Sequence, residues 1–327
     1  MILVCGGAGY IGSHMVRELV EQGLSVLVLD NLQSGHRAAV HPRAEFHQGD
    51  VRDPETLDRI MARGVSSVIH FAANSLVGES VLKPLQYYDN NVHGMERLLA
   101  AMVRNKVERV VFSSTAAVYG EPAKVPIVEE APAAPTNPYG ETKLAMEKMM
   151  KWAAKAHGLK YVSLRYFNVA GAMADGSLGE DHRPETHLIP LVLRVPLGQA
   201  EEIGVFGDDY DTPDGSCVRD YVHVCDLAQA HLLALEYLKK GGPGGIFNLG
   251  SAQGFSVMEI IRAAERVSGR PIKTVIKPRR AGDPARLVAD SSKARQILGW
   301  RPAFENIDDI ISTAWNWHQS HPEGWGQ

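Results

Sequence analysis

The chain has few cysteines, no long apolar run and no block of basic residues. Cys5, Cys217 and Cys225 are its three cysteines, and their spacing suits neither a zinc site nor a disulfide framework, so we expect a reducing, cytoplasmic location. Without a run of roughly 18 apolar residues, no membrane-spanning helix is expected. The first apolar run, residues 2–5, is too short for a signal-peptide core. A formal net charge of -4, with no local cluster of lysine or arginine, argues against a nucleic-acid partner.

Histidine is more common, but its pattern is equally uninformative. The 13 histidines are scattered without a pair at ligand spacing, so no metal ion is expected. With 45% hydrophobic and 22% charged residues, the composition is that of an ordinary globular protein. A length of 327 residues suffices for one large or two ordinary domains. Function therefore has to be inferred from local motifs.

Short apolar runs alternate with helical patterns over the first half of the chain. Strands are predicted at residues 2–5, 25–29, 44–47, 67–71, 109–113 and 161–166, and helices at 11–20, 54–62, 84–104 and 138–156. This alternation predicts an α/β fold, a Rossmann-type doubly wound parallel sheet with helices on both faces.

After about residue 168 the alternation gives way to loops rich in glycine, proline and aspartate. We therefore predict a dinucleotide-binding domain over residues 1–168 and a smaller, loop-rich substrate domain over residues 169–327. A helix at 226–239 and a strand at 246–249 interrupt the second part, and some of residues 221–250 are expected to return to the first domain.

A glycine-rich segment separates the first strand from the first helix. Gly6, Gly9 and Gly12 have the spacing G-x-x-G-x-x-G, which permits a tight turn, close approach of a pyrophosphate and close packing of helix on sheet. Asp30 ends the second strand, where a carboxylate accepts hydrogen bonds from ribose hydroxyls and repels a 2′-phosphate. A glycine-rich turn without a ligand is the alternative, but Asp30 favours NAD binding.

A tyrosine and a lysine lie one helical turn apart in the predicted helix 138–156. Lys143 can therefore lie beside Tyr139 and lower the tyrosine pKa from its ordinary value of about 10. Tyr-x-x-x-Lys occurs by chance on many helices, but here it follows the glycine loop and a hydroxyl-rich strand end that includes Thr115. Together these features predict the site of a nicotinamide-dependent oxidoreductase.

Over nearly its full length the chain resembles the extended short-chain dehydrogenase/reductases, and among them the UDP-glucose 4-epimerases. The resemblance rests on GGAGYIGSH (6–14), DNL (30–32), GDVRD (49–53), VGES (77–80), YYDNN (87–91), FSSTAAVYG (112–120), LRYFN (164–168), VFGDDY (205–210), VRDYVHV (218–224) and RRAGD (279–283). The early motifs are shared across sugar-nucleotide enzymes, whereas the later ones in combination are specific to the epimerases.

The resemblance implies an isomerase that interconverts UDP-galactose and UDP-glucose through a transient 4-keto sugar. Tyr139 would be the base at the C4 hydroxyl while NAD takes the C4 hydride. Thr115 would hydrogen-bond the same hydroxyl, and Lys143 would lower the tyrosine pKa and bond the nicotinamide ribose. The hydride would then return to the opposite face of the sugar, so NAD is regenerated in each turnover.

The resemblance also assigns binding residues. Besides Tyr139 and Lys143, the cofactor contacts are Gly6, Gly9, Tyr10, Ile11, Gly12, Asp30, Asn31, Leu32, Gln33, Ser34, Gly35, Asp50, Val51, Phe71, Ala72, Ala73, Ser75, Asn90 and Phe167. Besides Thr115 and Tyr139, the substrate contacts are Asn168, His187, Leu188, Val205, Phe206, Arg219, Arg280 and Asp283. Arg219 and Arg280 would bind the diphosphate. Their alternative is a salt bridge to Asp220 or Asp283, and for Phe206 a core position is nearly as well supported.

Two of the departures from the family pattern bear on function. Ser75 stands where many members have a lysine near the cofactor phosphates, which weakens the expectation that NAD stays permanently bound. Leu287 stands where the side-chain size is thought to limit the sugar, and it is smaller than the tyrosine of some members. UDP-N-acetylglucosamine is therefore a second candidate substrate.

The sequence also bears on several other functions. A 4,6-dehydratase needs an acid and a base after the threonine, and Ala116 and Ala117 cannot transfer protons. Epimerases of UDP-glucuronate or UDP-arabinose share the redox centre and stay open. A non-catalytic NAD-sensing protein is disfavoured because Tyr139, Lys143 and Thr115 occur together. By resemblance we also expect a role in galactose metabolism and a homodimer formed through the helices at 84–104 and 138–156.

Overall fold

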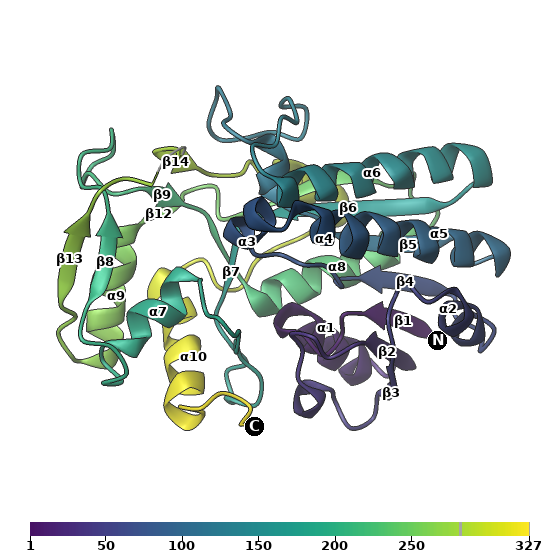
Figure 1. The fold of residues 1–327 in the computed structure, drawn as a ribbon, viewed down its shortest axis with the longest axis horizontal. Helices are drawn as coiled ribbons and strands as arrows, with labels where there is room; N and C mark the ends of the chain where they lie inside the picture. Colours follow the sequence, from purple (N-terminus) through teal and green to yellow (C-terminus); the bar gives the residue numbers. More distant parts are fainter. Residues whose placement is uncertain (281–282, 327) are drawn as a thin grey trace.

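A computed structural model of the protein describes residues 1–280 and 283–326, so Ala281 and Gly282 of the RRAGD segment lie outside the described residues. Its centre is a seven-stranded sheet in the order β11-β6-β5-β4-β1-β2-β3, with every neighbouring pair parallel (Figure 1). The strands are β1 (Ile2–Cys5), β2 (Val26–Asp30), β3 (Glu45–Gln48), β4 (Ser67–His70), β5 (Arg109–Ser113), β6 (Lys160–Tyr166) and β11 (Gly245–Leu249). The predicted Rossmann-type parallel sheet is confirmed.

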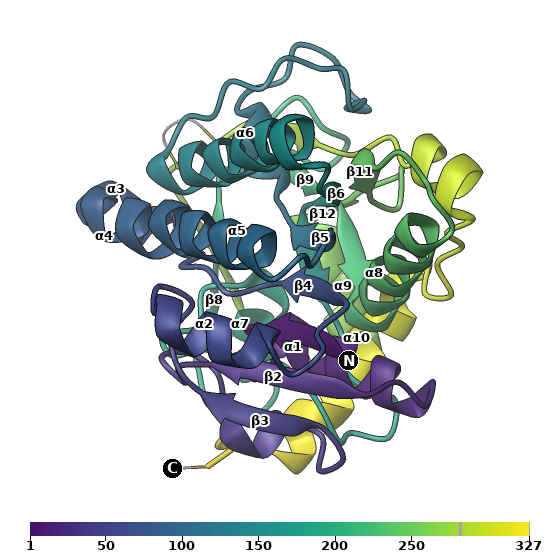
Figure 2. The same ribbon diagram turned by 90° about the vertical axis from the view of Figure 1, so that its right-hand side faces the viewer.

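Helices cover both faces of this sheet (Figure 2). One face packs against α1 (Tyr10–Glu21) and α8 (Val224–Lys239), and the other against α2 (Pro54–Met61), α5 (Gly94–Arg104) and α6 (Pro138–His157). Strands β1, β2 and β4 are buried at every position, as apolar runs without alternation predict for a doubly covered parallel sheet.

Local signals determine where α6 begins, and this matters because the helix carries Tyr139. The Asn137 side chain accepts a hydrogen bond from the backbone N–H of Gly140 at 2.9 Å, and Pro138 occupies the first turn. At the other end Gly158 has a φ of 73°, a conformation that glycine adopts without strain. Tyr139 therefore lies in the first turn of a well-capped helix.

The predicted helix 84–104 is divided in the structure. It consists of α4 (Pro84–Tyr87), a π-helical turn η2 (Tyr88–His93) and α5, and it follows a helix α3 (Val77–Leu82) that the sequence did not predict. Within the turn, the Asn91 side chain donates to the Thr142 hydroxyl at 3.0 Å and to the Asn74 carbonyl at 3.1 Å. Asn91 in this irregular turn thus connects the loop at Asn74 to Thr142 on α6.

The second half of the chain forms a smaller layer beside the sheet, at the left of Figure 1. Its helices are α7 (Leu188–Arg194), α9 (Val257–Ser268) and α10 (Ile307–Ser320), which share an apolar core with the strands β8 (Ile203–Phe206) and β10 (Tyr221–His223). Short strands complete it, namely β7 (Asn168–Ala170), β9 (Val218–Arg219), β12 (Phe255–Ser256), β13 (Thr274–Lys277) and β14 (Arg286–Leu287), and the short helix η4 (Ala294–Leu298) precedes α10. Two further short helices, η1 (Arg37–Ala39) and η3 (Ala116–Tyr119), belong to the first half of the chain.

The chain crosses between these two parts more than once. It leaves the main sheet after β6, builds β7 to β10, and returns to the sheet with α8 and β11, where Gly245–Leu249 pairs with residues 162–166 of β6. The predicted boundary between residues 168 and 169 stays a prediction. In the described part of the chain, none of the helices combines the length and the apolar character that crossing a membrane requires.

Candidate active site

A cleft of about 920 Å³ lies at the carboxyl edge of the main sheet. Residues at the ends of four parallel strands line it, because parallel strands all present their carboxyl ends at one edge of the sheet. They are Gly6 after β1, Asp30 at the end of β2, Phe71 after β4 and Ser113 at the end of β5. Residues of the second half close the cleft from the opposite side, among them Arg219 and Asp283.

The glycine loop could not be built from larger residues. A Cβ on Gly12 would lie 2.1 Å from the carbonyl oxygen of Gly6, and one on Gly6, whose φ is +80°, would lie 2.6 Å from the backbone nitrogen of Ala72. The Asp30 carboxylate accepts hydrogen bonds from the backbone N–H groups of Ala8 at 2.9 Å and Leu32 at 2.8 Å. Burial raises the pKa of Asp30, while these two hydrogen bonds oppose that shift. The carboxylate thus connects the glycine loop, through Ala8, to the segment that follows β2.

Replacing Asp30 with alanine should weaken NAD binding by roughly 10- to 100-fold, the equivalent of a hydrogen bond to a charged group. It should also relax the discrimination against NADP, because the repulsion of the 2′-phosphate is removed. Dissociation constants for both dinucleotides, measured by calorimetry on cofactor-free protein, test this. Asp30→Asn is the matched control, since its amide oxygen still accepts from the loop. An unchanged NAD-to-NADP ratio in both variants would contradict the ribose assignment.

Tyr139, Lys143 and Thr115 all line the cleft. Lys143 is buried, and its Nζ donates a hydrogen bond to the Ser113 carbonyl at 2.8 Å. That nitrogen lies 5.9 Å from the centre of the Tyr139 ring. The Thr115 hydroxyl oxygen accepts from the backbone N–H of Ala117 at 3.1 Å, which leaves its proton available to the tyrosine oxygen. The three residues are brought together as the sequence motifs predict.

Burial has the largest effect on the pKa values of this pair. Burial raises the pKa of Tyr139 above its ordinary value, and the hydrogen bond from Thr115 opposes this shift without cancelling it. Burial also lowers the pKa of Lys143 to about 7, while the charge of Glu147 acts in the opposite direction. Burial therefore opposes formation of the phenolate and Thr115 favours it, while the lowering of the tyrosine pKa by Lys143 stays a prediction.

Two arginines reach the cleft from the second half of the chain. Arg219 forms an ion pair with Asp283, and the Arg280 guanidinium lies 4.0 Å from the centre of the Phe206 ring. Both arginines and Asp283 line the cleft. The salt bridge that was the alternative role for Arg219 is therefore present, and both of its residues line the cleft.

The structure places most of the predicted site residues around this one cleft. Those that do not line it are Leu32, Asp50, Leu188, Val205 and Phe206. Val205 is buried in the core of the second half, and Leu188 packs against that core as the first residue of α7. The Asp50 carboxylate is held by Arg52 and Asn31, and the hydrogen bonds from Arg52 lower its pKa to about 2. For all five of these residues, the assignment as a cofactor or substrate contact stays a prediction.

Other lining residues were not predicted. They are Leu29, Gly49, Leu76, Val77, Gly78, Glu79, Leu82, Lys83, Ser113, Ala116, Ala117, Gly120, Tyr166, Val169, His182, Pro184 and Thr186. The VGES motif could have indicated the part on α3, had that helix been predicted. No sequence signal pointed to His182, because it lies in an irregular segment without periodicity.

The class of protein follows from comparison with known families. The model of the NAD dependent epimerase/dehydratase family matches residues 2–250, which is most of the chain. The chain belongs to this family. The glycine loop and the tyrosine–lysine pair lie within the matched region.

More particular similarities cover the whole chain. It is 58% identical over 326 residues to the UDP-glucose 4-epimerase of Lacticaseibacillus casei, covering 99% of this chain and 98% of that protein. A crystal structure of a UDP-glucose 4-epimerase superposes with a TM-score of 0.98 at 56% identity, covering 100% and 99% of the two chains. The enzyme of Bifidobacterium longum, solved with NAD⁺ and UDP, superposes with a TM-score of 0.93 at 42% identity, covering 99% of each chain. The predictions of family, of an isomerase and of NAD as cofactor are confirmed.

Proposed function

We propose that the protein interconverts UDP-galactose and UDP-glucose through a transient 4-keto sugar. The observation that carries the proposal is that Tyr139, Thr115 and Lys143 line the same cleft as the glycine loop. Bound NAD supplies the acceptor and donor for the C4 hydride. The similarity to UDP-glucose 4-epimerases supports UDP as the nucleotide and glucose or galactose as the sugar of the substrate.

Each of the three residues has a role that its environment supports. Tyr139 removes the proton of the C4 hydroxyl, and Thr115 stabilises the resulting phenolate by donating a hydrogen bond. Lys143 lowers the tyrosine pKa and bonds the nicotinamide ribose, and its hydrogen bond to the Ser113 carbonyl fixes its position. The other predicted residues that line the cleft divide by their place in the chain. We assign those in residues 1–168 to NAD binding and those in residues 169–327 to UDP-sugar binding.

One observation favours a broader range of substrates. Leu287 lines the cleft, so a branched aliphatic side chain, not a large aromatic one, limits the space there. An N-acetylated UDP-hexose is therefore a second candidate substrate of the same site. UDP-glucuronate and UDP-arabinose share the chemistry, but no described residue specifically favours them.

Proton NMR of UDP-galactose incubated with the purified protein, without added reductant, tests the proposed function. Conversion to a stable mixture with UDP-glucose is expected, because the hydride is returned in each turnover. Absence of conversion, even with NAD supplied, would rule out this substrate. A parallel incubation with UDP-N-acetylglucosamine tests the broader range, and negligible turnover relative to UDP-glucose would contradict it.

We also propose a cytoplasmic homodimer that serves galactose metabolism. Apolar side chains on and beside α3 and α4 are exposed, with Leu82 at 82% and Leu85 at 81%, and Trp152 on α6 is 64% exposed. Helices α4 and α6 are neighbours, so these side chains offer an apolar surface to a second copy of the chain. Leu85 on α4 and Trp152 on α6 lie within the helices predicted for the interface, whereas Leu82 lies on the preceding helix α3.

A further inference from the structure

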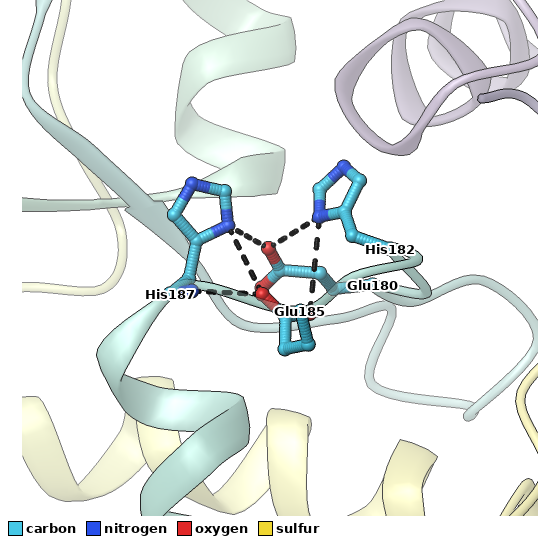
Figure 3. A group of neighbouring side chains, drawn as sticks. All are labelled: Glu180, His182, Glu185 and His187. Atoms are coloured by element: carbon cyan, nitrogen blue, oxygen red, sulfur yellow. Dashed lines mark hydrogen bonds and ion pairs between the residues drawn. The ribbon is translucent and has the colours of Figure 1, made fainter. Parts of the chain in front are cut away.

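Four side chains that could ligate a metal gather at the start of α7 (Figure 3). Glu180, His182, Glu185 and His187 come from the segment that leads into α7, and one potential ligand atom of each lies within 4.8 Å of all the others. The two histidines line the cleft, whereas the two glutamates lie behind them. Neither the motifs nor the proposed epimerase chemistry uses this cluster as a unit.

The two carboxylates of the cluster are buried without a lysine or arginine partner. The side chains of Glu180 and Glu185 are each 4% exposed, and in the described part of the chain all their ion pairs are with the two histidines. Two buried negative charges are costly unless cations are nearby or a metal ion is coordinated. Either protonation of the two histidines or a metal ion bound between the four side chains can supply this positive charge.

We propose that this cluster binds one zinc ion, with His182 Nδ1, His187 Nδ1 and one oxygen from each glutamate as ligands. Imidazole nitrogen and carboxylate oxygen are both common zinc ligands, with bonds of roughly 2.0–2.2 Å. Tetrahedral coordination with such bonds places ligand atoms roughly 3.3–3.5 Å apart. His182 Nδ1 lies 3.0 Å from Glu180 Oε1 and 3.8 Å from Glu185 Oε2. His187 Nδ1 lies 2.5 Å from Glu180 Oε1 and 3.5 Å from Glu185 Oε1. Small side-chain rotations therefore give the spacing that zinc requires.

The surrounding structure already orients the ligands. Glu185 Oε1 accepts hydrogen bonds from the backbone N–H groups of Thr186 at 2.7 Å and His187 at 2.8 Å. The backbone carbonyl of Glu180 accepts from the indole N–H of Trp317 at 3.1 Å. Such outer contacts fix metal ligands in place, and the cleft provides a path for the ion to enter.

Zinc titration of chelator-treated, metal-free protein tests the proposal, with calorimetry and metal analysis as readouts. We expect one zinc ion per chain. Cobalt should replace it and give the intense visible absorption of a tetrahedral site. Both readouts are independent of catalysis, so a failure of the proposed epimerase activity would not affect them.

Variants assign the binding to these residues. Glu185→Gln keeps the shape of the side chain and an oxygen that accepts from the backbone, but it removes the charge. We expect it, and His187→Gln, to weaken zinc binding at least about 10-fold. His157→Gln, at the exposed end of α6, is the matched control and should bind zinc as the wild type does. Absence of stoichiometric binding, or equal binding in all three variants, would overturn the proposal.

Discussion

Tyr139→Phe is expected to lower kcat by roughly 10²- to 10⁴-fold, the usual contribution of a general base. Only the hydroxyl oxygen is removed, and the ring keeps its place in the first turn of α6, so binding of NAD and of the UDP-sugar should change little. Turnover of UDP-galactose and the dissociation constants for NAD and UDP, measured on the same preparation, separate the two effects.

The structure offers a control for this substitution. Tyr88 is half-exposed and does not line the cleft, so Tyr88→Phe should leave kcat unchanged. Thr115→Val should lower kcat as well, because it removes the hydrogen bond that favours the phenolate. Near-normal turnover in Tyr139→Phe would exclude Tyr139 as the base.

Glu147→Leu is expected to destabilise the fold by about 3–5 kcal/mol, because it leaves a buried charge without its partner. Both side chains of the Glu147–Arg165 pair are 4% exposed, and the Arg165 Nε donates to Glu147 Oε1 at 2.9 Å. The Ser114 hydroxyl donates to the same oxygen at 2.6 Å. Urea unfolding followed by circular dichroism measures the change.

The double variant Glu147→Leu/Arg165→Met distinguishes a lost charge partner from lost packing. Replacing a whole buried ion pair with apolar side chains of similar volume is often close to neutral. We therefore expect the double variant to regain most of the stability that Glu147→Leu loses. A double variant as unstable as the single one would show that shape, and not the unpaired Arg165, causes the loss.

The first half of the fold could be predicted because its signals are local. Buried parallel strands read as apolar runs, and α6 has both an asparagine cap and a closing glycine. The predicted helix 84–104 was too regular, because a π-helical turn keeps apolar residues at similar spacing and leaves no mark in the sequence. After residue 168, strands such as β9 and β14 have only two residues, and they exist only through pairing between distant segments.

Part of the candidate site could likewise be predicted from the sequence, and part of it could not. Residues that follow strands could be placed together, because the carboxyl ends of parallel strands meet at one edge. The cluster of Glu180, His182, Glu185 and His187 could not, since an irregular segment gives no periodicity from which side-chain proximity follows. The raised pKa of Tyr139 was equally out of reach, because it depends on burial and not on the spacing to Lys143.

The return of the chain to its first sheet has a consequence for how the protein folds. Strand β6 gains its outer neighbour, β11, only when residues 245–249 are available, and α8 of the same late segment covers one face of the sheet. A nascent chain that ends near residue 168 exposes an unpaired strand edge and an uncovered apolar face. The nucleotide-binding half can therefore complete its sheet only after much of the substrate half has been synthesised. The two halves thus fold as one unit with many long-range contacts, and folding of such a unit is slow.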